Sequence, residues 1–300
     1  MIAMQISTSS FYDMNAKRIS AMTARATQLQ TEIATGKKVQ TPSQDPAVSQ
    51  QLAEIGRKDQ DAEVYGKNMT LAGSLLDQAD GVLGQIGTQL QRARELATKA
   101  ATGTETVESR KIIGTELASI VDAIAGLANT RNVRGQPLFG TPDGTLAVAR
   151  DANGVFQYAT TNVSEVPIAD NQTVQATESA SRIFQGATGD TLNMLDALAK
   201  VLVGGDADGT AARAALDDIS AAGDRVDVVQ ASVGARSARV ELQQSLQMTT
   251  GTDRNELRSK LEDTDVPAAY IEFQQMMTAL QATQQSFSKL SQLSLFDYLR

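Results

Sequence analysis

The 300-residue chain contains no histidine, no cysteine and no tryptophan, and it has only 7 Phe and 5 Tyr. Without His and Cys there is no Ser-His-Asp or Cys-His nucleophile pair, no imidazole base, no thiolate zinc site and no disulfide. Carboxylates, Lys, Tyr, Ser and Thr remain, and they could still build a hydrolase or a magnesium site. An enzyme is therefore disfavoured but stays an alternative, and an aromatic content of 4% argues against one large globular core.

Positive charge and long apolar runs are also scarce. Lys and Arg total 27 against 35 Asp and Glu, which gives a net charge of −8. A nucleic-acid surface needs clustered excess cations, so no nucleic-acid partner is predicted. No run of about 18 uncharged apolar residues occurs, and the segment from Met1 to Asp13 lacks the apolar core of a signal peptide. We therefore expect no membrane partner and no Sec-dependent export.

Proline, which breaks helix interiors, is absent from two stretches of about 90 and 100 residues. In the first stretch, apolar residues from Leu76 to Ala100 recur at alternating spacings of three and four, which indicates a helix packed as in a coiled coil. A polar break at residues 102–106 offers N-caps, and a second stripe runs from Ile113 to Leu127. The pattern predicts a helical hairpin.

The second proline-free stretch carries apolar residues seven apart, at Ile219, Val226, Val233 and Val240. Thr210 is the predicted N-cap of this helix, which would run about 40 residues, or roughly 60 Å. A helix of this length needs another helix on which to bury its stripe, and the predicted hairpin is the available candidate.

Residues 136–185 differ from both helical stretches. They hold three of the six prolines and an alternating run around Val148, which is followed by Asn153-Gly154 and then by Val155 and Phe156. This order predicts a β-hairpin with an Asn-Gly turn. A small β-rich insert is therefore expected between two sets of helices.

The two ends of the chain each predict one amphipathic helix. Their apolar stripes are formed by Phe11, Met14, Met22, Leu29 and Ile33 and by Phe273, Met276, Leu280, Phe287 and Leu290. Neither helix has the charge or capping to be stable alone, so we expect them to pair with each other or with neighbouring subunits. Met22, Met276 and Met277 fit either the core of such a pair or an adaptable binding groove.

A helix stop and a helix start follow one another between Gly36 and Pro46. Gly36 ends the first helix, and Asp45 caps the next helix with Pro46 at its first position. The segment resembles the Ser-Gly-x-x-(Ile/Val)-x-x-(Pro/Ala)-x-Asp-Asp-Pro turn of the flagellin superfamily, with Thr35 in place of Ser and Gln44 in place of the first Asp.

Further segments resemble the same family, in order along the chain. They are Tyr65–Asn68, Leu90–Ala97, Leu127–Thr130, Gly234–Arg236, Leu261–Asp265 and Ser294–Leu299. The resemblance extends over both helical stretches and both ends and leaves the insert unmatched. The last segment is similar to the ending of the members that join hook and filament, whereas filament flagellin usually ends near Leu-Ser-Leu-Leu and stays the alternative.

The resemblance implies a mainly α fold. A long antiparallel helical rod or coiled coil, with paired N- and C-terminal helices, would carry a small β-rich insert. Residues 1–43 and 256–300 would form a terminal coiled-coil domain, residues 44–135 and 186–255 a helical rod domain, and residues 136–185 the outer insert.

The resemblance also implies a structural adaptor of the bacterial flagellum, with no active site and no cofactor, that is located outside the cell. Such a chain would be exported unfolded through the flagellar type III apparatus and would assemble into a ring through its terminal helices. The implied partners are flagellin, hook-associated protein 1, an export chaperone and further copies of the chain. The implied interface residues are those of the two terminal stripes with Leu295, Phe296 and Tyr298, and, between rods, Arg92, Arg94, Glu95 and Asn129.

Two acidic clusters suggest other chemistry. Asp206 and Asp208 precede a Gly as in a calcium loop, but the third ligand position and the later Glu are missing, so a polar helix–helix turn is the simpler interpretation. Glu262, Asp263 and Asp265 could bind a metal or act in acid–base chemistry, but at the start of the last helix they serve as caps.

A third cluster combines both signs of charge. Arg92, Arg94 and Glu95 could form an anion site, but on a helix surface they fit contacts between subunits or solvated pairs better. Neither a metal site nor an anion site is therefore predicted.

Overall fold

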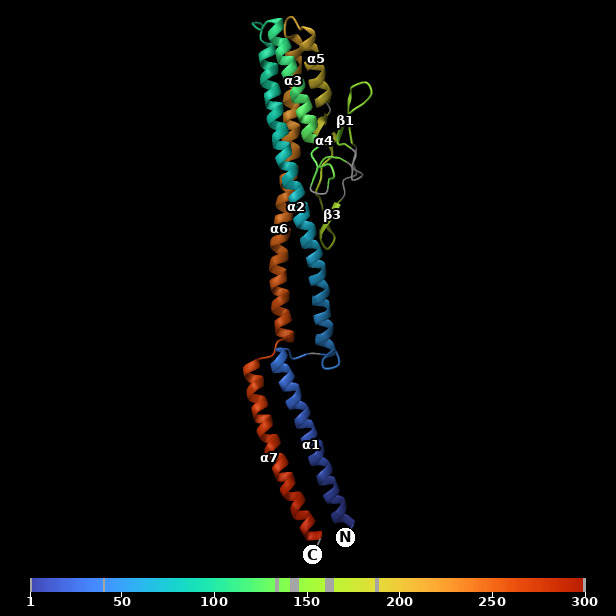
Figure 1. The fold of residues 1–300 in the computed structure, drawn as a ribbon, viewed down its shortest axis with the longest axis vertical. Helices are drawn as coiled ribbons and strands as arrows, with labels where there is room; N and C mark the ends of the chain where they lie inside the picture. Colours follow the sequence, from blue (N-terminus) through green and yellow to red (C-terminus); the bar gives the residue numbers. More distant parts are fainter. Residues whose placement is uncertain are drawn as a thin grey trace. The chain divides into compact units, whose positions relative to one another are not determined.

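The computed structural model describes residues 2–39, 41–132, 135–140, 146–159, 165–186 and 189–298. Its helices are α1 (Ile2–Thr35), α2 (Pro46–Ala101), α3 (Val107–Ala128), α4 (Ala180–Phe184), α5 (Thr191–Gly204), α6 (Thr210–Glu262) and α7 (Val266–Tyr298). Its strands are β1 (Val148–Arg150), β2 (Phe156–Tyr158), β3 (Glu165–Ala169), β4 (Gln172–Gln175), β5 (Gln185–Gly186) and β6 (Gly189–Asp190). The predicted mainly α fold with a small β part is confirmed (Figure 1).

The chain forms two compact units. Unit 1 consists of Met1–Gln60 and Thr250–Arg300, and unit 2 consists of Asp61–Thr249. The unit boundaries fall inside α2 and α6, whereas the predicted domain boundaries at residues 43/44 and 255/256 lie close to helix ends. The separate domain status of residues 136–185 stays a prediction.

The predicted helix stop and start in unit 1 are confirmed. Helix α1 ends before Gly36, whose φ of 71° suits a residue without a Cβ atom. Helix α2 begins at Pro46, and the Asp45 carboxylate accepts hydrogen bonds from the amides of Ala47 (3.1 Å) and Val48 (3.0 Å). Asp45 is therefore an N-cap, and Pro46 occupies a position whose amide has no helical partner.

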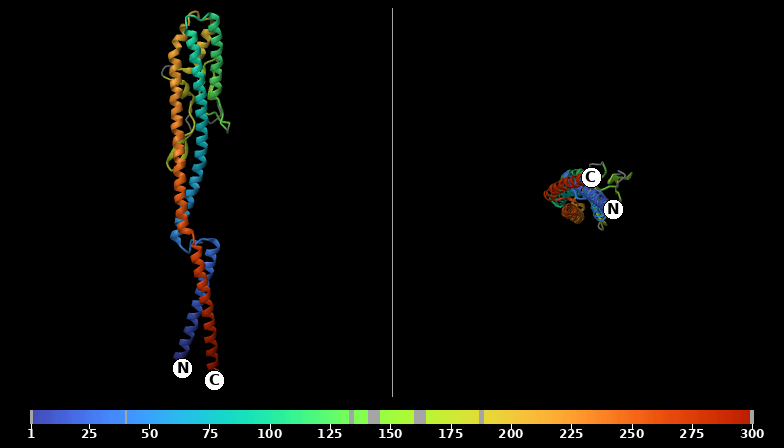
Figure 2. Two further views of the ribbon diagram at one scale, coloured as in Figure 1. Left: turned by 90° about the vertical axis from the view of Figure 1, so that its left-hand side faces the viewer. Right: turned by 90° about the horizontal axis from the view of Figure 1, so that it is seen from below.

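Unit 1 is built on the packing of α1 against α7. Leu29 and Leu280 are buried, as are the small residues Ala26 and Ala269. Two backbone hydrogen bonds join the segments next to these helices, from the Lys38 amide to the Glu262 carbonyl (2.7 Å) and from the Thr264 amide to the Gly36 carbonyl (2.8 Å). The predicted pairing of the two terminal helices is thus confirmed, and Figure 2 shows them side by side.

In unit 2, α2 and α6 bury the two apolar stripes that their residue spacings predicted. Leu76, Leu83, Ile86 and Leu90 of α2 are buried, and so are the residues of the α6 stripe, at Ile219, Val226, Val233 and Val240. A Cβ atom added at Gly73 of α2 would lie 4.0 Å from Val240, which shows how directly the two helices face each other.

Helix α6 differs from its prediction in two respects. It has 53 residues instead of about 40, because the polar segment after Leu246 contains no proline and Gly251 costs a helix only about 1 kcal/mol. Thr210 is its first helical residue and not its N-cap. The Asp208 carboxylate accepts hydrogen bonds from the amide (3.1 Å) and hydroxyl (2.7 Å) of Thr210.

The helical hairpin of α2 and α3 is confirmed, and α3 has its cap at Thr106, whose hydroxyl accepts from the Ser109 amide (3.1 Å). Helix α3 packs closely against α5 in the same unit. Between α2 and α3 the buried guanidinium of Arg110 donates to the carbonyls of Ala100 (2.9 Å), Thr102 (2.9 Å) and Ala207 (2.8 Å). Arg110 therefore ties the α2–α3 turn to the α5–α6 turn.

The predicted β-hairpin is present as β1 and β2, an antiparallel pair with Val148 opposite Tyr158. In its turn the Asp151 carboxylate accepts from the amides of Asn153 (2.8 Å) and Val155 (2.9 Å), and Gly154 has a φ of 79°. Thr145, which belonged to the predicted first strand, lies outside the described residues. The hairpins β3–β4 and β5–β6 and the short helix α4 were not predicted.

Candidate assembly interfaces

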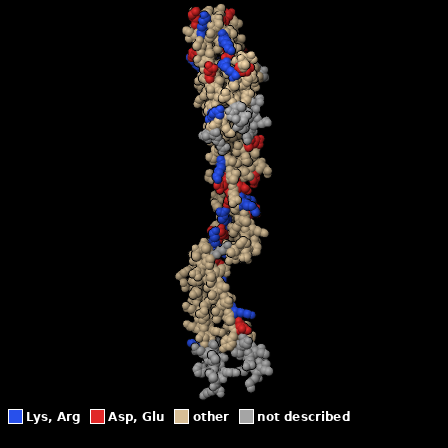
Figure 3. All heavy atoms as spheres, turned by 45° about the vertical axis from the view of Figure 1, so that its right-hand side comes forward, with Lys and Arg blue, Asp and Glu red and all other residues tan. Residues whose placement is uncertain are grey.

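The α1–α7 pair of unit 1 has little charge. Helix α7 has no Asp, Glu, Lys or Arg from Phe273 to Ser288. In Figure 3 the part of the surface that α1 and α7 form is mostly tan, whereas blue and red atoms are spread along the surface of unit 2. Charged side chains normally make the exposed surface of a helix soluble in water. Since this pair has few of them, its surface is suited to contacts with further protein.

The terminal stripes are only partly covered by this pairing. Leu29 and Leu280 are buried, whereas Met22, Ile33, Phe273, Met276 and Phe287 are half-buried. Met14 is 63% exposed. The side chains of Phe11, Leu290, Leu295, Phe296 and Tyr298 lie outside the described part of the structure. Of the described stripe residues, one copy of the chain thus buries only Leu29 and Leu280.

Polar contacts fix the register of α1 against α7. The Arg25 guanidinium donates to the Glu272 carboxylate through Nε (3.0 Å) and Nη2 (2.8 Å). Arg25 also pairs with Glu32 at 3.5 Å, and Glu32 accepts from the Gln28 amide group at 2.8 Å.

In the same unit, Asp59 of α2 pairs with Arg254 (2.8 Å) and Arg258, which lie near the C-terminal end of α6. The hydrogen bond from Arg254 is the main reason that the pKa of Asp59 is lowered, with Arg258 adding to it.

A shallow hollow of about 660 Å³ lies along α1. Its lining contains no charged residue and consists of Ser20, Thr23, Ala24, Thr27, Gln28, Thr31 and Gln44. The hydroxyls of Thr23, Thr27 and Thr31 donate to the carbonyls four residues earlier, at 2.9, 3.0 and 2.9 Å. These three hydroxyl donors are therefore already used within α1.

The residues predicted for contacts between rods lie on unit 2. Arg92 donates to Glu116 (3.0 and 2.7 Å) and to Glu95 (3.3 Å), and its pKa is raised mainly by the hydrogen bond to Glu116. Arg94 is exposed. The Asn129 side chain donates to the Val148 carbonyl (2.8 Å) and accepts from the Val148 amide (3.0 Å). Arg92, Glu95 and Asn129 thus have partners within one chain, and their role between chains stays a prediction.

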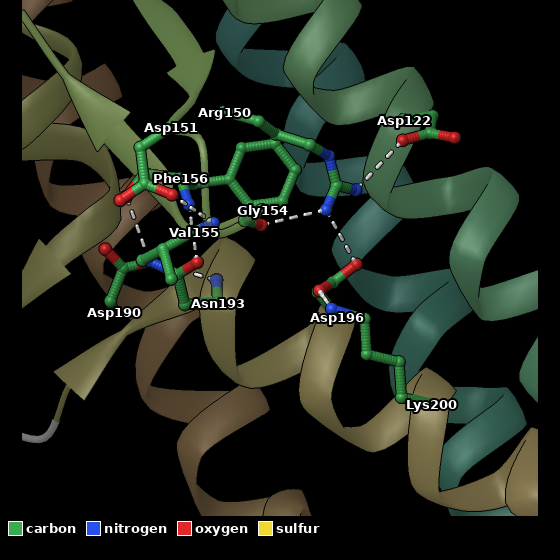
Figure 4. A network of polar contacts seen from close by, with 10 residues as sticks. All are labelled: Asp122, Arg150, Asp151, Gly154, Val155, Phe156, Asp190, Asn193, Asp196 and Lys200. Carbon is green, nitrogen blue, oxygen red and sulfur yellow. Dashed lines mark hydrogen bonds and ion pairs between the residues drawn. The ribbon is translucent and has the colours of Figure 1, made fainter.

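A polar network that was not predicted holds the β1–β2 hairpin on α3 and α5 (Figure 4). Arg150 donates to Asp196 (3.1 Å), to Asp122 (3.2 Å) and to the Gly154 carbonyl (3.3 Å), and its guanidinium lies 4.0 Å from the centre of the Phe156 ring. No signal in the sequence pairs Arg150 with a carboxylate 46 residues away. The insert is therefore fixed to the helices of unit 2 by specific contacts.

The carboxylates of the acidic clusters stabilise a turn and cap a helix. Asp206 accepts from the Gly209 amide (3.3 Å), and Asp265 accepts from the Ala268 amide (3.1 Å) at the start of α7. Glu262 pairs with Lys37. Within the described ranges, no three Asp or Glu side chains are close enough together to hold a metal ion. In the same ranges no helix is both long and apolar enough to cross a membrane.

Comparison with known proteins identifies the family. The model of the bacterial flagellin N-terminal helical region matches residues 6–142. The flagellar hook-associated protein 3 of Escherichia coli (strain K12) is 25% identical over 314 aligned positions, which cover 98% of this chain and 99% of that protein. The chain is similar to the flagellin superfamily, and to hook-associated protein 3 over its full length. Its resemblance to this family is thereby confirmed, and the family is structural and non-enzymatic.

Within the superfamily, the homology to hook-associated protein 3 extends along the whole chain. The flagellin of Listeria monocytogenes (serovar 1/2a) is 29% identical over 106 residues, which cover 35% of this chain and 37% of that protein. A solved structure of a flagellar hook-associated protein from Vibrio parahaemolyticus has a TM-score of 0.67 and 21% identity, and it covers 73% of this chain and 100% of that protein. That structure supports the same fold.

Proposed function

We propose that this chain is the structural adaptor that joins the hook-associated zone of the bacterial flagellum to the flagellin filament. The observation that carries the proposal is the full-length similarity to hook-associated protein 3, beside a similarity to flagellin that covers 35% of the chain. As a flagellar hook-associated protein, the chain is a component of the flagellum outside the cell. Filament flagellin remains the second candidate, supported by the match of the flagellin N-terminal model.

Assembly into a ring through α1 and α7 completes the proposal. The pair leaves Met14 exposed and Met22, Phe273, Met276 and Phe287 half-buried, and α7 has no charged residue from Phe273 to Ser288. Two helices alone cannot bury an apolar stripe on each of their faces, so neighbouring copies supply the missing helices. The interface in this proposal also includes Phe11, Ile33, Leu290, Leu295, Phe296 and Tyr298.

The partners follow from the same role. The ring contacts hook-associated protein 1 on one side and flagellin on the other, and exposed charges on unit 2 such as Arg94 contribute to contacts between copies. Before assembly the chain is exported unfolded by the flagellar type III apparatus with the help of a chaperone. The absence of cysteine fits this route, since no disulfide has to form after export.

A deletion strain tests the adaptor role. Loss of the chain should leave hooks without filaments and release flagellin into the medium, and the wild-type gene should restore filaments. Electron microscopy of the cells and immunoblots of the medium give the two measurements. Normal filaments in the deletion strain would refute the adaptor role. Hooks without filaments and without flagellin in the medium would support the second candidate, because the deleted chain would then be the flagellin subunit itself.

The same strain tests the terminal interface. Met14→Glu places a charge on a side chain that is 63% exposed, so the single chain should fold normally but fail to assemble. Ile112→Glu is the matched control, because Ile112 is 70% exposed on α3 of unit 2. We expect filaments with Ile112→Glu and none with Met14→Glu. A normal number of filaments with Met14→Glu would show that Met14 does not belong to the interface.

A further inference from the structure

Methionine is the side chain of this protein that mild oxidants attack most readily. The sequence has 9 Met and no cysteine, tryptophan or histidine, so the thioether is its only sulfur group. Six of the nine lie in the stretches assigned to unit 1, at Met1, Met4, Met14, Met22, Met276 and Met277. The oxidisable groups are therefore concentrated towards the two ends of the chain.

Two of these methionine side chains are open to solvent in the single chain. Met14 is 63% exposed and Met277 is 36% exposed. The Tyr12 ring of α1 packs edge-on against the Phe287 ring of α7, with 5.5 Å between the ring centres. Residues two positions apart differ by about 200° around a helix, so Met14 lies on the side of α1 away from Phe287. A small oxidant can reach Met14 without any opening of the α1–α7 pair.

Two methionines of unit 2 provide internal comparisons. Met69 is fully buried in the core, so its sulfur is shielded from solvent. Met248 is 74% exposed on α6 but belongs to unit 2, outside the terminal stripes. Oxidation of Met248 therefore reports exposure alone, without any change to α1 or α7.

Oxidation changes what a methionine side chain can pack against. A peroxide transfers one oxygen atom to the sulfur: the O–O bond breaks, an S–O bond forms, the sulfur loses two electrons and hydrogen peroxide is reduced to water. The thioether packs well against irregular apolar surfaces, whereas the sulfoxide is polar. Burying the sulfoxide oxygen in an apolar contact without a hydrogen-bond donor costs free energy. A chain oxidised on α1 and α7 is therefore poorly suited to contacts that cover these helices.

We propose that Met14 and Met277 form an oxidation-sensitive site, at which peroxides convert the thioethers to sulfoxides in the unassembled chain and thereby block its assembly. The inference rests on the proposed function, in which neighbouring copies cover α1 and α7. A flagellar component outside the cell works beyond the reducing cytoplasm, where oxidants meet it. Assembled copies are protected because their terminal helices are covered, so the oxidation acts on chains that have not yet assembled.

Peptide mapping by mass spectrometry tests the accessibility of the site. The purified chain is treated with hydrogen peroxide, and samples are quenched with free methionine at intervals. We expect sulfoxide at Met14, Met277 and Met248 well before Met69, and much slower oxidation of Met14 in assembled flagella than in the free chain. Equal oxidation rates of Met14 and Met69 in the free chain, or of Met14 in free and assembled chains, would overturn the inference.

Co-sedimentation with hooks tests the consequence of oxidation. Hooks isolated from the deletion strain are mixed with the purified chain, either untreated or treated with peroxide only until Met14 and Met277 are oxidised. The treatment should weaken binding by about tenfold or more, which is the effect of burying one unsatisfied polar group. Methionine sulfoxide reductases should restore binding, because the sulfoxide is reversible. Unchanged binding of the oxidised chain would overturn the inference.

Two variants assign the effect to its residues. Met248→Leu is the matched control, and peroxide should weaken its binding as much as that of the wild type. In the double variant Met14→Leu and Met277→Leu, the treated and untreated samples of the same variant should bind equally, because neither side chain can form a sulfoxide. A loss in the double variant as large as in the wild type would overturn the assignment. The proposed function would fail differently, because the untreated wild-type chain would then not bind hooks at all.

Discussion

Gly114 offers a direct test of how closely α3 and α5 pack in unit 2. A Cβ atom added at Gly114 would lie 2.9 Å from the Ala199 carbonyl oxygen, 2.9 Å from the Leu202 Cβ atom and 2.9 Å from the Val203 amide nitrogen. Two of these three atoms belong to the backbone and cannot rotate away. Gly114→Ala must therefore push the two helices apart by several tenths of an ångström.

The expected loss of stability follows from two opposing effects. Ala favours a helix over Gly by about 1 kcal/mol, whereas overpacking a tight core costs about 1–3 kcal/mol or more. Because the clash involves backbone on the opposing helix, we take the upper end of that range and expect Gly114→Ala to destabilise unit 2 by about 2 kcal/mol. For a unit of this size, that corresponds to a melting temperature about 4–8 °C lower.

Gly126 on the same helix is the matched control. A Cβ atom there would meet nothing within 4 Å, so Gly126→Ala should stabilise the unit by about 0.4–1 kcal/mol. Melting followed by circular dichroism at 222 nm, with hydrogen exchange of the α3 amides, measures both variants. If Gly114→Ala were as stabilising as Gly126→Ala, the close contact of α3 with α5 would be refuted.

Two further variants probe buried charges of unit 2. Arg110→Ala should lower the free energy of unfolding by about 3 kcal/mol, because it leaves three carbonyl oxygens without their donor; an unchanged urea midpoint would contradict this role. Burial raises the pKa of Asp196, but its contacts with Lys200 and Arg150 outweigh that effect and lower the pKa overall. The stability that the Asp196 carboxylate contributes is therefore full above its unfolded pKa of about 3.9 and is lost as the pH falls through its lower folded value. The difference in urea midpoint between the wild type and Asp196→Asn should be large at pH 7 and shrink below about pH 4, and a difference independent of pH would exclude the ionic role.

The parts of the fold that were predicted correctly depend on neighbours in the sequence. The cap at Asp45, the first-turn Pro46 and the break before Thr106 are recognisable because each signal acts within four residues. The stripe from Ile219 to Val240 is recognisable because a helix repeats every 3.6 residues. These local rules also predicted the β1–β2 hairpin through its Asn-Gly turn.

What escaped prediction depends on residues far apart in the chain. Strand β3 contains Pro167, which argues against a strand, but its hairpin has only two strands, so a missing amide donor is tolerated. Buried Glu178 accepts from Arg236 of α6, 58 residues later, at 2.6 Å. The Asn129 side chain forms two hydrogen bonds with the backbone of Val148. No spacing rule pairs such residues, because the fold alone brings them together.

The two units differ in how much of their structure one chain can complete. The continuous buried core of the described residues runs from Met69 to Val240 and lies entirely in unit 2, where several helices and the β-hairpins contribute to it. Among the described side chains of unit 1 few apolar ones are buried, and Leu29 and Leu280 are the largest of these between α1 and α7. A pair of helices with so small a buried area gains little free energy against the cost of ordering its residues. The scarcity of charge on α7 would then be a liability in a free protein, whereas in an assembly the same uncharged surface is what neighbouring helices can cover.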